Sequence, residues 1–169
     1  MSHMFSNTIV KEIPISLNVK PNTNCDISSL IEYAKQLEYL PVINNCKPTT
    51  SGIQYMCSNC HNLKEISIDF DNWDLSTMVN SGYCYEGNWH NTCHSLRTIP
   101  MNYYNKLFQL KTTGKTSYFY SVYYNLVWNC FNVDEIIDMP VMVLDTYTSN
   151  AFYNSFTNAY RLKDFTFKV

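Results

Sequence analysis

Charged residues, glycine and long apolar runs are all scarce in this chain, and each scarcity excludes a class of function. Only 15% of the 169 residues are Asp, Glu, Lys or Arg, against about 25% in an ordinary soluble domain. The net charge of −2 gives no electrostatic basis for binding nucleic acid or an anionic membrane. The four glycines are scattered, so no Gly-rich loop can cradle a phosphate group.

No apolar run approaches the roughly 20 residues that a membrane-spanning helix needs, so we expect no membrane insertion. The longest run, Met139 to Leu144, already contains a proline. The start, Met1-Ser2-His3-Met4, lacks the charged region and apolar core of a signal peptide. The segment Met1–His3 also fits a cloning scar before a natural Met4, an alternative that is compatible with a signal peptide removed from the natural sequence.

Pairs of residues that could carry catalysis are also missing. Cys60-His61 and Cys93-His94 are sequence neighbours, whose side chains point in different directions. A working nucleophile and base need hydrogen-bond reach and a third group that orients the base, and nothing supplies one. The sequence therefore predicts no enzyme and no cofactor.

What is present is a motif that returns five times: a small anchor residue, Leu or Val three residues later (+3) and an apolar residue six later (+6). The copies span residues 34–40, 60–66, 93–99, 130–136 and 159–165. Self-similarity at a spacing of 20–50 residues is typical of stacked repeats. Asn stands directly before three of the anchors, at Asn59, Asn129 and Asn158.

Each repeat is predicted to contain a helical or turn-like segment before the anchor and a short strand after it. Apolar and polar residues alternate after the anchor, as in a strand. We expect strands near 37–42, 63–68, 96–101, 133–139 and 162–167 to stack in order as one parallel sheet. The residues at +3 should be buried: Leu37, Leu63, Leu96, Val133 and Leu162.

The chain divides into two parts in this interpretation. Residues 1–27 do not fit the motif and predict a strand-like N-terminal cap, because their apolar residues mostly alternate with polar ones. Residues 28–169 form about five repeats in a single domain, alone or as part of a longer array. The final strand at Phe165–Val169 predicts an edge that a partner or further repeats cover.

The pattern Cys-x-x-Leu-x-x-Ile-Pro at 93–100 resembles the BspA-like leucine-rich repeats. The blocks 73–78 (WDLSTM), 144–150 (LDTYTSN) and 150–154 (NAFYN) add to the resemblance, which covers residues 28–169. It implies an α/β repeat solenoid with short parallel strands, helical turns and long insertions. The family occurs on bacterial and protist surface proteins and in phage structural proteins, where it mediates attachment. It has no catalytic residues to carry over.

The seven cysteines cannot all be paired within one chain, because their number is odd. Three are anchors (Cys60, Cys93 and Cys130), for which we expect buried thiols. The alternative is zinc held by Cys57, Cys60, His90 and Cys93, whose spacing tetrahedral zinc would accept. His61 and His94 share the position after the anchor (+1) and predict a ladder on neighbouring coils.

Tyrosine and asparagine take the place of charge, and 14 Tyr make the surface resemble a binding surface. The uneven repeat spacing predicts insertions near 82–88 and 112–115. We predict that they carry the contact with a partner, through Tyr85, Trp89, Tyr118 and Tyr123. The alternative is that these aromatic residues only join the insertions to the core.

The leading hypothesis is a non-enzymatic binding or structural repeat domain, a phage virion component of tail or fibre type. Its partners would be other proteins, of the virion or the host surface, or surface glycans. The first alternative is a secreted or cell-surface bacterial adhesin of the leucine-rich repeat type. The second is a zinc-stabilised cytoplasmic interaction module. The first two place the chain on the virion or outside the cell.

Overall fold

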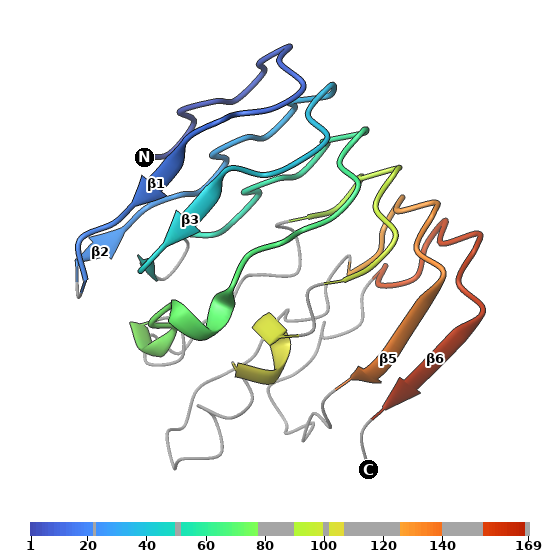
Figure 1. Cartoon of the computed structure of the whole chain (residues 1–169). Coiled ribbons are helices and arrows are strands. Elements are labelled where there is room, and N and C mark those ends of the chain that lie inside the picture. The colour runs from blue at the N-terminus through green and yellow to red at the C-terminus, as the bar shows by residue number, and fades with distance from the viewer. Residues whose placement is uncertain are drawn as a thin grey trace.

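The computed structural model describes residues 1–21, 23–49, 52–77, 90–99, 102–106, 126–139 and 154–167. The described chain runs as successive coils stacked on one another, with the two termini at opposite ends of the stack (Figure 1). Its strands pair two by two, and every pair is parallel: β1 (Ser16–Asn18) with β3 (Val42–Asn44), β2 (Asn24–Cys25) with β4 (Lys47–Pro48), and β5 (Glu135–Met139) with β6 (Asp164–Phe167).

The strands are shorter than the sequence predicts, and in the described residues they form three two-stranded sheets rather than the one parallel sheet expected. β5 and β6 fall in the windows expected for them, and β3 begins where the first predicted strand ends. Residues 63–68 and 96–99 are not in strands. Neighbouring coils are joined there by isolated hydrogen bonds, such as Lys64 N–H to Glu38 O (3.1 Å), rather than by a continuous ladder.

In the described residues, turns rather than helices precede each anchor, and another tight turn follows it. In all five motif copies the +3 residue donates its N–H to the carbonyl of its own anchor, from Leu37 to Ala34 (3.1 Å) through to Leu162 on Ala159 (3.2 Å). This hydrogen bond explains why the anchor and the +3 position recur at a fixed distance. Short helical elements lie elsewhere, in η1 (Phe70–Asn72) and at residues 102–106.

The residue before each anchor (−1) has left-handed backbone, with φ near +60°. Asn visits this conformation more readily than other non-glycine residues, which explains why it precedes three of the anchors. A second left-handed residue lies four positions earlier in several coils, including Ser29 and Tyr55. The residues at −1 are Asn7, Tyr33, Asn59, Thr92, Asn129 and Asn158, with φ between 54° and 61°.

One backbone hydrogen bond repeats at every interface between coils. The N–H at −1 donates to the carbonyl of the next coil at −2, over 2.8 to 3.1 Å. The pairs are Asn7 to Glu32, Tyr33 to Ser58, Asn59 to Asn91, Thr92 to Trp128 and Asn129 to Thr157. Within the described residues, five such bonds join six coils, although the sequence motif marks only five coils.

The additional coil is the N-terminal segment, which the sequence predicts to be a strand-like cap. Its −1 residue is Asn7 and its anchor is Thr8, and β1 is its strand. Lys11 stands at +3, where the other coils have Leu or Val, so the sequence of this coil does not match the motif. The backbone nevertheless follows the same turns, because Phe5 and Asn7 bond to Leu30 and Glu32 of the second coil.

The core runs through the middle of the stack and is built from equivalent positions of successive coils. The burial predicted at +3 is confirmed for Leu37, Leu63, Leu96 and Val133, which are fully buried, whereas Leu162 is partly buried. Aromatic side chains fill a second region, where Phe70 packs edge-on against Trp73. Tyr103 and Tyr104 are fully buried beside them.

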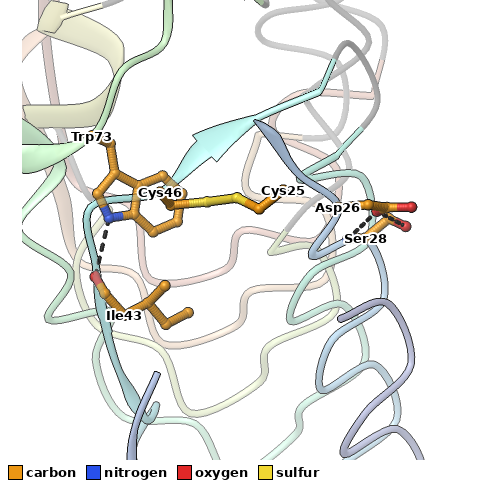
Figure 2. The surroundings of a disulfide bond; sticks show 6 residues. All are labelled: Cys25, Asp26, Ser28, Ile43, Cys46 and Trp73. Carbon is orange, nitrogen blue, oxygen red and sulfur yellow. Dashed lines mark hydrogen bonds between the residues drawn. A yellow bond between two sulfur atoms is a disulfide. The ribbon is translucent and has the colours of Figure 1, made fainter. Parts of the chain in front are cut away.

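A disulfide fastens the N-terminal end of the stack. Cys25, in β2, is bonded to Cys46, which immediately precedes β4 (Figure 2). The segment after η1 is tied to the same place, because Trp73 Nε1 donates to Ile43 O (3.1 Å) and Asp74 N–H donates to Cys46 O (2.9 Å). Lys47 and Asp74 form an ion pair over 2.7 Å.

We expect Thr92→Asn to raise the unfolding free energy by about 1 kcal/mol, measured by chemical denaturation. Thr92 has φ 54°, a conformation that a β-branched residue adopts only with strain. Asn relieves that strain, and a side-chain ladder already exists at this position, from Asn158 Nδ2 to Asn129 Oδ1 (2.8 Å). The reverse change, Asn59→Thr, should destabilise by a similar amount. A stabilising effect of Asn59→Thr would contradict this account.

Candidate functional site

The four residues that the sequence analysis selects for binding lie outside the described part of the chain. Tyr85 and Trp89 belong to residues 78–89, and Tyr118 and Tyr123 belong to residues 107–125. Their role stays a prediction. The described coils, however, carry three features with chemical content: a buried row of thiols, a stacked row of rings and a polar groove.

The anchor cysteines form a row of buried thiols. Each donates its S–H to a carbonyl three residues before the anchor of the preceding coil (−3). Cys60 reaches Ile31 O (3.0 Å), Cys93 reaches Cys57 O (3.1 Å) and Cys130 reaches His90 O (3.6 Å). The thiols therefore satisfy backbone acceptors that Ala at the same position would leave without this donor. Their predicted burial as free thiols is confirmed.

The zinc-like spacing of Cys57, Cys60, His90 and Cys93 follows from the repeat itself. Cys57 and His90 stand at −3, and Cys60 and Cys93 are the anchors, so the two pairs are the same two positions in successive coils. Among the described residues, no three His, Cys, Asp or Glu side chains converge as a metal site requires. Burial raises the pKa of both anchor thiols well above its usual range, which disfavours the thiolate needed for nucleophilic attack or zinc binding.

His90 is a fully buried imidazole that bonds to a buried tyrosine. Its Nε2 lies 2.9 Å from the hydroxyl of Tyr104, and the two rings meet edge to face. Burial lowers the pKa of His90 to about 4, because the interior cannot solvate the imidazolium. His90 is therefore neutral at physiological pH and joins the fourth coil to the short helix at 102–106.

A row of stacked rings follows the +1 position over four coils. His61 and His94 are stacked with centroids 4.2 Å apart, which confirms the predicted ladder. The row continues through Phe131, 4.4 Å from His94, to Tyr160, 5.5 Å from Phe131. Rings at equal positions of coils about 4.8 Å apart meet face to face. Burial lowers the pKa of both imidazoles, so the stack favours their neutral forms.

Charged residues follow the +4 position beside this row. Glu38 is paired with Lys64 of the next coil, and the pKa of Glu38 lies below its usual range because Lys64 bonds to its carboxylate. Two coils further on, Asp134 forms an ion pair with Arg161 over 2.9 Å. Arg97 occupies +4 between these pairs. Within the described residues it has neither an ion pair nor a hydrogen bond from its side chain.

A groove of about 590 Å³ opens on this face of the stack, across the second to fifth coils. It exists because the coil of Cys93 carries small residues, Ser95 and Thr98, at positions where the neighbouring coils carry larger ones. Its lining residues are Tyr39, Lys64, Glu65, Ser95, Arg97, Thr98 and Asn132.

Comparison of the chain with known protein families, with curated proteins and with solved structures found no match. The described residues include no helix long and apolar enough to cross a membrane. The case for a function therefore depends on the residues and their arrangement.

The groove is lined by charged and hydrogen-bonding side chains. Lys64 and Arg97 supply cations, Glu65 supplies a carboxylate, and the shorter side chains supply hydroxyl and amide groups. Lys64 Nζ lies 5.4 Å from the centroid of the Tyr39 ring, which holds the ring at the rim. The sequence analysis missed the groove. Aligning the motif copies shows the small residues at +2 and +5, Ser95 and Thr98, on either side of Arg97 at +4.

Proposed function

We propose that this chain is a non-enzymatic attachment domain of the leucine-rich repeat type, a virion component of tail or fibre kind that binds proteins or glycans. The observation that carries the proposal is the backbone hydrogen bond repeated at all five coil interfaces. Coils held in one register present equivalent side chains in rows on an extended surface, which is how stacked repeats build binding faces.

The distribution of side chains between the surface and the interior supports the same function. The exposed rows carry stacked rings, paired charges and a polar groove, whereas the reactive groups are turned inward. The anchor thiols are buried, and burial raises their pKa values. An interaction domain needs exposed rings, charges and a groove, and it does not need exposed reactive groups.

The disulfide favours the second candidate, a secreted or cell-surface adhesin. Disulfides persist in oxidising surroundings and are rare in the cytosol, where virions assemble. The Cys25–Cys46 bond therefore fits a chain that reaches the exterior by secretion. Mass spectrometry of the alkylated protein from its native source separates the two candidates. If the disulfide is already present in newly made protein that has not been released from the cell, the chain does not assemble in a reducing compartment, and the virion candidate is excluded.

The experiment that tests attachment is a Tyr118→Ala/Tyr123→Ala double variant. Truncating an interface tyrosine at a hot spot typically costs about 2 kcal/mol of affinity, so we expect at least a 30-fold weaker binding to the partner surface or a matching loss of incorporation into particles. The control is Tyr33→Ala/Tyr55→Ala, which removes two tyrosines that are exposed on turns of the stack.

A normal fold with unchanged affinity in the Tyr118→Ala/Tyr123→Ala variant would contradict the placement of the contact in the insertions. The contact would then be sought at the C-terminal edge, Phe165–Val169. Equal losses in the test and control variants would show a nonspecific effect of removing tyrosine.

A further inference from the structure

We propose that the groove beside Arg97 binds an acidic glycan, a sugar chain that bears a carboxylate. This inference rests on the proposed attachment function and names one of its ligands. Arg97 would bind the carboxylate, because it is an exposed cation flanked on both sides by charges that are already paired.

Arg97 is the cation of the groove that has no ion pair among the described residues. On one side Glu38 is paired with Lys64, and on the other Asp134 is paired with Arg161. Arg97 lies between these pairs, and no described acidic side chain pairs with it. A guanidinium presents a planar fork of donors that matches a carboxylate with two parallel hydrogen bonds. A carboxylate bound from solution would give Arg97 the partner that its neighbours already have.

The rest of the lining fits a sugar. A saccharide exposes hydroxyl groups that both donate and accept hydrogen bonds, and a flat apolar ring face. Ser95, Thr98 and Asn132 offer donors and acceptors, Glu65 accepts from hydroxyl groups, and the half-exposed ring of Tyr39 offers a flat surface. The groove volume of about 590 Å³ lies within the range of small-ligand sites.

The same lining argues against an acidic peptide. Peptides dock through apolar pockets, by adding a strand to a sheet edge or, when they are acidic, on clusters of arginines. Among its described lining residues the groove has a single arginine, Arg97, and its lysine, Lys64, is already paired with Glu38. The groove has neither apolar side chains other than Tyr39 nor strand backbone in its described walls, since residues 63–68 and 96–99 are not in strands.

The test is calorimetric titration of the whole chain with two pairs of probes. The pairs are 3′-sialyllactose against lactose, and trigalacturonic acid against its methyl ester. We expect at least one acid to bind at least 10-fold more tightly than its neutral counterpart. Arg97→Gln should abolish that difference, because it removes the charged fork, whereas Tyr39→Ala should weaken binding of the acid and of the neutral probe.

Arg161→Gln is the matched control, since it removes an exposed arginine two coils away that belongs to an ion pair outside the groove. It should leave the affinity for the acid unchanged. The inference is overturned if neither acid is preferred, if Arg97→Gln keeps the preference, or if only an acidic peptide binds. The attachment function stands in those cases if the Tyr118→Ala/Tyr123→Ala variant still loses its partner, so the two failures are distinguishable.

Discussion

Removing the disulfide by Cys25→Ala/Cys46→Ala is expected to lower the free energy of unfolding by about 3 kcal/mol. The bond closes a loop between residues 21 positions apart, and a loop of that size restricts the unfolded chain by about this amount. It also holds β2 and β4 together at a place where only two residue pairs are in strand register. Denaturation in urea at constant protein concentration measures the loss.

The reductant response provides the control. Wild-type protein should lose a similar amount of stability in a phosphine reductant, whereas the double variant should show no response. The four described free thiols are fully buried and have no disulfide to lose, so the reductant should act only through the Cys25–Cys46 bond. The disulfide would be contradicted if the reductant left the unfolding free energy of the wild-type protein unchanged and if all its cysteines could be alkylated after unfolding.

Acid should destabilise the protein through His90, by up to about 3 kcal/mol between pH 7 and pH 4. The pKa of His90 is about 4 in the folded chain, against 6.5 for an ordinary histidine, which applies to the unfolded chain. Between those values the unfolded state binds a proton that the folded state excludes, so stability falls as the pH falls. At about 1.4 kcal/mol per pH unit, the gap sets the size of the loss.

His90→Gln isolates this effect, because glutamine keeps a hydrogen bond to Tyr104 and does not titrate. The variant should lose some stability at pH 7 but show a flatter dependence of unfolding free energy on pH. His61→Gln/His94→Gln is the comparison: those imidazoles are only partly buried, and their pKa values are lowered in the same direction. An equally steep acid response in His90→Gln would show that other groups cause it.

Much of the coil geometry follows from local sequence. The anchor and the residue at +3 are joined by one turn hydrogen bond, so their spacing is a property of four consecutive residues. Asn before the anchor reports the left-handed backbone, and the burial of Leu37, Leu63, Leu96 and Val133 follows from apolar residues at fixed positions. The stacked imidazoles of His61 and His94 also follow, since equal positions on neighbouring coils meet.

The remaining features depend on contacts between segments far apart in the chain. Cys25 and Cys46 do not belong to the repeat motif, so their spacing carries no sign that they are bonded. The first coil lacks the apolar +3 residue and forms because its backbone bonds to the second coil. The strands predicted near 63–68 and 96–101 depend on continuous pairing with their neighbours, which residues 63–68 and 96–99 do not make.

What the sequence determined by itself is therefore the repeated turn, its buried face and the inward thiols, because each depends on a few neighbouring residues. Only the tertiary structure decided which side chains meet across coils. It placed Arg97 between two completed ion pairs and left a groove over Ser95 and Thr98. The physical reason is that a repeat fixes which positions face outward, whereas the charge and size of side chains on adjacent coils decide what that surface can bind.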